Sequence, residues 1–140
     1  MNEVHCKLVA QNDLEQMKPV TTKLGIDLER LADFLKHSQN LAFIAELHGE
    51  VVGLIYGYVL VSLNSAPQLF VYAVDVLPKF QNQGIGSKLF QYVVDYSRRN
   101  GFSECFVITD KANKKACRIY EKAGGKNDFE DEIVYVIKHG

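Results

Sequence analysis

The stretch that decides the fold runs Val74-Asp75-Val76-Leu77-Pro78-Lys79-Phe80-Gln81-Asn82-Gln83-Gly84-Ile85-Gly86-Ser87. It begins as an apolar strand, turns through polar residues and two glycines, and then enters a segment of helical periodicity. Such a turn exposes several backbone N–H groups at a helix N-terminus, where the helix dipole adds partial positive charge. Glycine at 84 and 86 lacks the Cβ atoms that would keep an anion away. The stretch therefore predicts a phosphate or pyrophosphate site.

Two other phosphate-binding motifs do not match this turn. The dinucleotide fingerprint G-x-G-x-x-G needs a third glycine at position 89, where Leu89 stands. The P-loop pattern is absent, because its glycines lie further apart than Gly84 and Gly86. Taken alone, the turn also fits a helix that simply begins with glycines after a loop.

Working outward from the turn, hydrophobic periodicity and turn signals predict the other elements. Asp27 is expected to cap a helix, Pro19 to interrupt the helix before it, and Gly53 and Gly57 to mark bulges or close backbone approach. The expected strands are 4–10, 41–47, 51–61, 68–77, 105–109 and 133–137, and the expected helices are 12–18, 27–37, 84–100 and 111–122. This order predicts an α/β (α+β) domain with a mixed, mostly antiparallel sheet.

Length and composition narrow the class of protein. The 140 residues are 47% hydrophobic and 24% charged, which fits one globular domain over residues 1–140. The net charge of −1 does not indicate a large basic surface of the kind that binds nucleic acid. Cys6, Cys105 and Cys117 are odd in number and widely spaced, so we expect neither disulfides nor a metal site. Met1 to Ala10 does not resemble a signal peptide, and no apolar run is long enough to span a membrane, so we expect a cytoplasmic protein.

Two motifs in the sequence resemble those of a known protein family. Gln81-Asn82-Gln83-Gly84-Ile85-Gly86 resembles the Q/R-x-x-G-x-G/A signature of the GNAT superfamily of N-acetyltransferases. About thirty residues later, Asn113, Ala116 and Tyr120 share one helix face in the pattern N-x-x-A-x-x-x-Y-x-K-x-G, which resembles the family's second CoA segment. The resemblance implies the GNAT fold, with a central sheet splayed between its fourth and fifth strands and flanked by about four helices.

The resemblance also implies the cosubstrate and the residues that bind it. Acetyl-CoA is expected, without a metal, with its pyrophosphate on the turn and its pantetheine arm along the preceding strand. The binding residues carried over are Val74, Val76, Gln81, Asn82, Gln83, Gly84, Ile85, Gly86, Ser87, Asn113, Ala116 and Tyr120. The candidates for the CoA 3′-phosphate are Lys111, Lys114, Lys115 and Arg118, which also fit a solvated helix face.

The catalytic residues expected are Tyr120 and Asp75. Tyr120 would protonate the departing thiolate, and Asp75 would take the proton of the amine. Three runs, 41–45, 51–55 and 69–72, look similar to aminoglycoside 3-N-acetyltransferases, which carry an aspartate where this chain has Ala73. Asp75 lies two residues further on the same strand face, so the identity of the base stays open. The acidic group Asp128, Glu130, Asp131 and Glu132 reads either as a solvated loop or as a rim that attracts a cation.

The function expected from this reading is transfer of an acetyl group from acetyl-CoA to a primary amine of a small molecule. Direct attack is expected, without a covalent enzyme intermediate. The alternatives are acetylation of a protein or peptide amine, and a CoA-binding module without turnover. We expect no nucleic-acid or membrane partner, and the resemblance admits a homodimer. The sequence does not name the acceptor.

Overall fold

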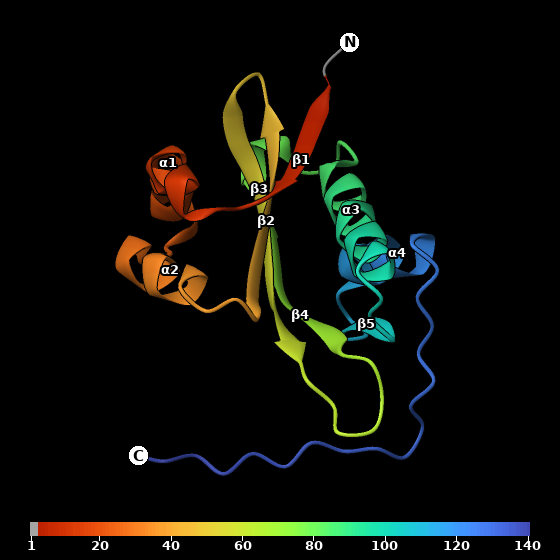
Figure 1. Ribbon diagram of the computed structural model, residues 1–140. Coiled ribbons are helices and arrows are strands. Elements are labelled where there is room, and N and C mark those ends of the chain that lie inside the picture. Colours follow the sequence, from red (N-terminus) through yellow and green to blue (C-terminus); the bar gives the residue numbers. More distant parts are fainter. Residues whose placement is uncertain (1–2) are drawn as a thin grey trace.

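A five-stranded sheet with helices on both faces forms the body of the computed structural model, which describes residues 3–140 (Figure 1). Met1 and Asn2, which belong to the stretch expected not to be a signal peptide, lie outside the described residues. The strands are β1 Val4–Leu8, β2 Asn40–Leu47, β3 Glu50–Leu60, β4 Gln68–Val76 and β5 Glu104–Val107. The helices are α1 Leu14–Leu24, α2 Leu28–Leu35, α3 Ile85–Arg99 and α4 Lys114–Lys122, with short 3₁₀ turns at Gln11–Asp13 and Pro78–Phe80.

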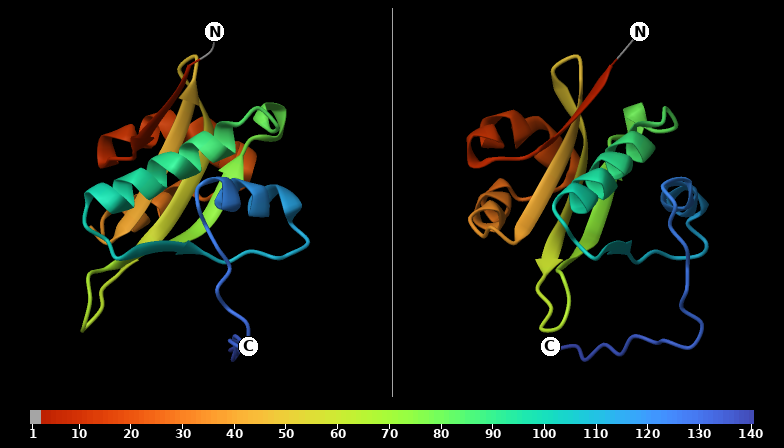
Figure 2. Two further views of the ribbon diagram at one scale, coloured as in Figure 1. Left: turned by 90° about the vertical axis from the view of Figure 1, so that its right-hand side faces the viewer. Right: turned by 45° about the vertical axis from the view of Figure 1, so that its right-hand side comes forward.

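The strands follow one another across the sheet in the order β1-β2-β3-β4-β5. The first three pairings are antiparallel, and β4 pairs with β5 in parallel. In Figure 2, α3 crosses one face of the sheet and α1 and α2 lie behind the other. The predicted fold class, a mixed and mostly antiparallel sheet with four helices, is confirmed for the described residues.

The β2–β3 hairpin holds two long strands of the sheet in register. His48 and Gly49 both have positive φ, 53° and 78°, as a two-residue type I′ turn requires. Gly57 lies at a break in the β3–β4 register, where a Cβ atom would collide with the carbonyl oxygen of Phe70. The expectation that Gly57 marks close backbone approach is therefore confirmed, since any larger residue would push β4 away from β3.

Side chains alternate between the two faces and build two separate cores. Toward α3, Phe43 and Leu89 are buried, and the Phe43 ring meets Tyr96 edge-on at 5.2 Å between centroids. Toward α1 and α2, Ile44 and Leu54 are buried under the helix pair. The sheet is thus closed by apolar contacts on both faces, which fixes β4 between them.

The helix predicted to stop near Lys18 continues through Pro19, so that boundary was wrong. α1 runs to Leu24 because Met17 and Val20, on either side of the proline, have no exposed surface. Proline in a helix interior costs about 3 kcal/mol, whereas burying two such side chains contributes about 3–6 kcal/mol.

The predicted cap of α2 is confirmed, because Asp27 Oδ1 accepts from Glu29 N at 2.9 Å.

The last strand, predicted over 133–137, is not formed. Residues beyond Gly125 run as an extended segment away from the sheet and below the loop between β3 and β4 (Figure 1). We call residues 126–140 the C-terminal arm. A strand needs a partner edge for its backbone groups, and the arm contacts none in this chain.

None of the helices in residues 3–140 combines the length and apolar character needed to cross a membrane.

Candidate active site

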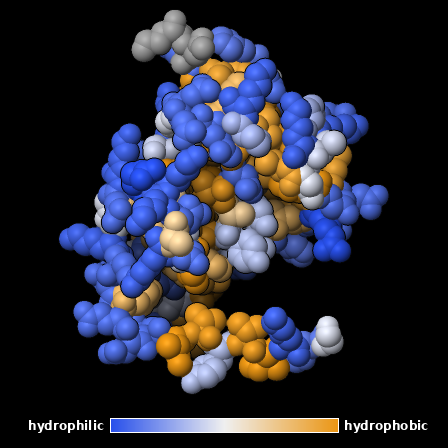
Figure 3. Space-filling model, turned by 180° about the vertical axis from the view of Figure 1, so that it is seen from behind, coloured by the Kyte–Doolittle hydropathy of each residue, from blue (hydrophilic) through white to orange (hydrophobic). Residues whose placement is uncertain are grey.

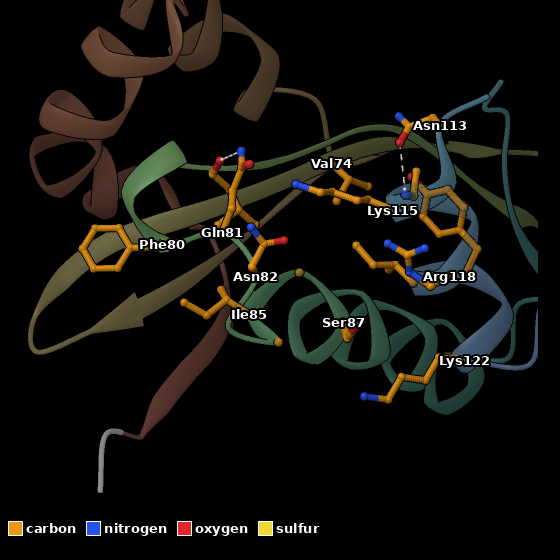
Figure 4. A pocket seen from close by; sticks show the side chains of 16 residues that line it. Val74, Phe80, Gln81, Asn82, Ile85, Ser87, Asn113, Lys115, Arg118 and Lys122 are labelled. Carbon is orange, nitrogen blue, oxygen red and sulfur yellow. Dashed lines mark hydrogen bonds between the residues drawn. The ribbon is translucent and has the colours of Figure 1, made fainter. Parts of the chain in front are cut away.

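A cleft of about 460 Å³ opens between the start of α3 and the inner face of α4 (Figure 4). The strand end at Val74 and Val76 forms its back wall, and the turn after Phe80 forms its rim. Its lining residues are Val74, Val76, Phe80, Gln81, Asn82, Gly84, Ile85, Gly86, Ser87, Asn113, Lys115, Ala116, Arg118, Ile119, Tyr120 and Lys122. The two motifs found thirty residues apart in the sequence therefore meet across one cavity.

The turn at the start of α3 has the backbone shape that an anion site needs. Asn82 and Gly84 both take left-handed conformations, with φ of 64° and 79°. Such residues turn successive N–H groups toward one side, and α3 adds the positive end of its dipole. Gly84 is required by its own φ, because a side chain there would strain the backbone. The turn is anchored by Gln81, whose Nε2 donates to the carbonyl oxygen of Val76 at 3.0 Å.

Gly86 lines the cleft and also lies at a close contact between elements. A Cβ atom there would lie 3.0 Å from Ile119 Cδ1 and 3.6 Å from Val76 Cγ2. The missing side chain therefore lets α3 pack closely against α4 and β4. Of the two glycines, Gly84 shapes the turn and Gly86 brings the two walls of the cleft together.

Helix α4 carries positive charge into the cleft. Lys115, Arg118 and Lys122 follow one another at helical spacing and all line it. Figure 4 shows Lys115 and Arg118 reaching from α4 toward the turn. Asn113 fixes where the helix begins, because its Oδ1 accepts from Ala116 N at 3.1 Å as an N-cap. Three cations thus face the dipole end of α3, which is an arrangement for a polyanion.

The outer edge of β4 is unpaired where it borders the cleft. β5 pairs with β4 only as far as Val71 and then leaves the sheet. Leu77 N donates to Val52 on β3 at 2.9 Å, so the alternation of a strand turns the N–H and C=O groups of Val76 and Val74 to the opposite, open edge. The carbonyl oxygen of Val76 already accepts from Gln81, so the N–H of Val76 and both groups of Val74 are left to hydrogen-bond an extended ligand with amide groups of its own.

Tyr120 closes the inner end of the cleft. Its ring packs against Phe90 of α3, with centroids 4.8 Å apart. Burial raises the pKa of the Tyr120 hydroxyl, and Cys117 and Asp75 raise it further. A phenol with a raised pKa keeps its proton at neutral pH, so Tyr120 is held in the form that donates.

Asp75 lies on the other face of β4 from the cleft. It stands opposite Leu54 in the strand register, on the side covered by α1 and α2. Burial raises the pKa of its carboxyl group. The pKa of Tyr56, on the same face, is raised by burial first and then by Tyr58, Tyr72 and Asp75. On the cleft side, Asp75 adds to the effect of burial and of Cys117 on the pKa of Tyr120. The carboxylate therefore acts on both sides of the unpaired strand edge.

Most of the residues expected to bind a cosubstrate line the cleft. Gln83 does not, and its Nε2 donates to Lys79 O at 3.4 Å instead. Lys111 and Lys114 also lie outside the lining, and the acidic group 128–132 belongs to the C-terminal arm. Phe80, Ile119 and Lys122 line the cleft and were missed by sequence reasoning. Lys122 could have been found by extending the spacing of Lys115 and Arg118 by one helical turn.

Comparison with known proteins gives one family and several relatives. The model of the acetyltransferase (GNAT) family matches residues 10–125. The chain is 30% identical over 105 residues to spermidine N(1)-acetyltransferase of Escherichia coli strain K12, covering 71% of this chain and 53% of that protein. The chain thus spans about half the length of the first curated relatives it matches.

Solved structures share the fold over nearly the whole chain. An aminoglycoside acetyltransferase from an uncultured soil metagenomic sample, in complex with trehalose, superposes with a TM-score of 0.79 and 27% identity, covering 97% of this chain and 95% of that one. An aminoglycoside N-acetyltransferase in complex with CoA has a TM-score of 0.77 at 17% identity, covering all of this chain and 97% of that one, and shares the fold.

The anion site is testable without any organic ligand. Replacing Arg118 and Lys122 together by Ala should weaken binding of inorganic pyrophosphate about 10-fold at low salt, because each exposed charge pair contributes up to about 1 kcal/mol. Isothermal titration calorimetry measures the change. The matched control replaces Lys111 and Lys114 by Ala, which removes the same amount of charge from residues that lie outside the cleft. Equal weakening by both pairs would show a general charge effect and contradict a local site.

Proposed function

Because the chain belongs to the acetyltransferase (GNAT) family, we propose that it transfers the acetyl group of acetyl-CoA to a primary amine of a small molecule. One juxtaposition supports this proposal. The anion-binding turn of α3, the unpaired edge of β4 and the hydroxyl of Tyr120 all border the same cleft. These are the three features needed to hold a pyrophosphate, an amide-bearing arm and a departing thiol in a row.

Each part of acetyl-CoA has a matching wall in this cleft. The turn around Gly84, with Arg118 and Lys122 opposite, offers amides and cations for the pyrophosphate. The open N–H and C=O groups of Val74 match an amide of the pantetheine arm. The N–H of Val76 is left for the thioester end, since the carbonyl oxygen of Val76 accepts from Gln81. Lys115 and Arg118 are the two cations of the expected set that line the cleft, and both reach toward the turn, which suits the 3′-phosphate or the pyrophosphate.

The proposed reaction is direct aminolysis of the thioester. The amine nitrogen attacks the acetyl carbonyl carbon, a C–N bond forms, and the C–S bond breaks with its electron pair going to sulfur. An alkylamine with pKa near 10 is mostly protonated at neutral pH, so a base must take its proton. Asp75, directly or through water, takes that proton, and Tyr120 gives one to the thiolate. The open N–H of Val76 is placed to stabilise the negative charge that develops on the carbonyl oxygen.

The cysteines support direct attack over a covalent acyl-enzyme. A cysteine nucleophile must reach its thiolate form at working pH. Burial raises the pKa of Cys105 to about 11, and burial also raises the pKa of Cys6. Neither lines the cleft, and Cys117 lies on α4 with its Sγ 3.7 Å from the carbonyl oxygen of Asp110. The three free thiols also fit the reducing cytoplasm, which we propose as the location.

The acceptor is proposed to be a small molecule because a curated relative at 30% identity is named for spermidine and a solved structure at 27% identity is an aminoglycoside acetyltransferase. A neighbour named for a ribosomal protein is 17% identical and shares the fold alone. A protein or peptide amine and a CoA-binding module without turnover are the competing functions. A thiol-release assay with acetyl-CoA and separate panels of polyamines, aminoglycosides, amino acids and peptides decides among the three. Thiol release with peptides alone would instead support acetylation of a protein or peptide. Tight CoA binding without thiol release for any amine would instead support a binding module.

Replacing Tyr120 by Phe tests the proposed acid. The ring and its contact with Phe90 stay, so the melting temperature and the acetyl-CoA Kd should hardly change. Without the hydroxyl, kcat should fall by about 10- to 10³-fold, and the fall should be smaller with an acyl donor whose thiol leaves more easily. Ile119→Val, beside it on the cleft wall, is the packing control. A normal kcat in Tyr120→Phe would remove the acid role.

Replacing Asp75 by Asn tests the proposed base through the pH profile. The carboxyl must be ionised to act, and burial raises its pKa, so wild-type kcat/KM should fall on the acid side at a pH above the usual range of aspartate. In Asp75→Asn, kcat/KM should no longer fall on the acid side, and its value should be lower than that of the wild type by about 10²-fold or more. The folded chain binds this proton more tightly than the unfolded chain, so ionised Asp75 destabilises the fold at neutral pH, and the melting temperature should not drop. If the pH profile of Asp75→Asn matched that of the wild type, Asp75 would not be the base, and a water molecule would be the candidate for that role.

A further inference from the structure

Helix α4 and the residues on either side of it form a strongly basic surface. Residues 111–126 hold six of the chain's 16 Lys and Arg but only one of its 17 Asp and Glu. Seen from behind in Figure 3, the left side of the molecule, where α4 lies, is covered mainly by hydrophilic side chains. All six basic residues are exposed, and we call them the α4 basic ridge: Lys111, Lys114, Lys115, Arg118, Lys122 and Lys126.

The charges of the α4 basic ridge have no counter-charges in the folded chain. None of the six forms an ion pair with a carboxylate among residues 3–140, whereas Lys7, Lys18, Lys23 and Lys36 all do. Outside residues 111–126, the chain carries ten Lys and Arg against sixteen Asp and Glu. Positive potential is therefore concentrated along one helix of a molecule whose remainder is negative.

The ridge extends beyond the cleft. Lys115, Arg118 and Lys122 line the cleft, whereas Lys111 and Lys114 do not. Lys114, Arg118 and Lys122 are spaced four residues apart, so they share one side of the helix over about 12 Å. A ligand that fills the cleft alone leaves Lys111 and Lys114 without a partner. The positive surface is thus longer than the anion site that it borders.

The walls of the cleft match the part that CoA shares with other phosphopantetheine thioesters. The turn at Gly84 suits a phosphate, the open groups of Val74 suit an amide, and Tyr120 suits a departing thiol. A second hollow of about 270 Å³ adjoins the cleft beside Ser87 and Lys122, and its lining holds no aromatic ring and no arginine. Nucleobases stack on such planar groups, so this hollow offers an adenine no stacking surface.

We propose that the α4 basic ridge docks an acidic carrier protein, whose phosphopantetheine arm brings an acetyl thioester into the cleft as a second donor beside acetyl-CoA. Lys111 and Lys114 then face carboxylates of the carrier outside the cleft, while the phosphate of the arm lies at the turn around Gly84. A long nucleic acid fits less well, because it would also run along the negative remainder of the surface. The inference rests on the proposed function for its chemistry, but docking of the carrier does not need turnover.

Transfer from the carrier uses the same bond changes as transfer from acetyl-CoA. The amine nitrogen attacks the acetyl carbonyl carbon, a C–N bond forms, and the C–S bond to the arm breaks with its electron pair going to sulfur. The amine proton goes to Asp75, and Tyr120 gives a proton to the sulfur. The products are the acetylated amine and the free thiol of the carrier, so no other reactant is consumed.

Binding of a purified acyl carrier protein tests the docking surface. Its unacetylated phosphopantetheine form is titrated into the full chain by isothermal titration calorimetry at low salt. Replacing Lys111 and Lys114 together by Ala should weaken this binding about 10-fold, because each exposed charge pair contributes up to about 1 kcal/mol. The acetyl-CoA Kd should stay unchanged, because neither residue lines the cleft. The matched control replaces Arg30 and Lys36 by Ala, which removes the same charge from α2 on the other face of the sheet and should bind the carrier like the wild type.

Turnover with two donors tests the delivery of the thioester. The acceptor is the amine that gives the fastest thiol release from acetyl-CoA. The variant with Lys111 and Lys114 replaced should lose about 10-fold in kcat/KM for the acetyl-loaded carrier, in line with its weaker binding, and keep its kcat/KM for acetyl-CoA. Raised salt should lower kcat/KM for the carrier in the wild type more than in the variant.

The outcomes separate this inference from the proposed function. No carrier binding, or equal weakening by the α2 control, would overturn the docking surface even if acetyl-CoA is turned over. A carrier that binds but does not donate its acetyl group, while acetyl-CoA does, would overturn the second donor. Binding of a single-stranded RNA through Lys111 and Lys114, without binding of the carrier, would show a nucleic-acid surface instead. Carrier binding that depends on these two lysines, without transfer from either donor to any amine, would leave the docking surface standing and overturn the proposed function.

Discussion

Only four residue pairs hold β5 to β4, and beyond Val71 the two parallel strands separate. The site depends on that separation, because it leaves the outer groups of Val74 and the outer N–H of Val76 without a strand partner beside the cleft. The carbonyl oxygen of Val76 is taken by Gln81. In the proposed function, an extended substrate arm hydrogen-bonds the groups that remain. The strand holds its shape meanwhile, because β3 pairs with its other edge along its whole length.

The same strand separates the two substrates of the proposed reaction. Val74 and Val76 face the cleft of α3 and α4, while Asp75 between them faces α1 and α2. In the proposed reaction, these three consecutive residues serve the acyl donor on one side of the strand and the acceptor on the other. The raised pKa of Tyr120 reflects burial first, with Asp75 adding to it, so the two sides are coupled electrostatically.

The sequence was informative where structure depends on neighbours along the chain. The α3 turn and the Asp27 cap both follow from local backbone chemistry, and both were predicted. The continuation of α1 through Pro19 depends instead on the burial of Met17 and Val20 by distant strands. The close approach of Ile119 to Gly86 likewise joins two helices that only the fold brings together. Residues 133–137 have the composition of a strand, but a strand also needs an edge to pair with.

β4 carries one extra residue at Tyr72, because Tyr56 pairs with Ala73 and Gly57 pairs with Val71. This bulge sets which sequence changes the strand can accept. Deleting Tyr72 would give a regular strand in which Val74 and Val76 still face α3 with Leu69 and Val71, and Asp75 still faces the other side. Inserting one residue between Ala73 and Asp75 with the bulge retained would instead turn Asp75 toward α3. The two sides of the site therefore tolerate the loss of one residue at the bulge but not the gain of one residue beyond it.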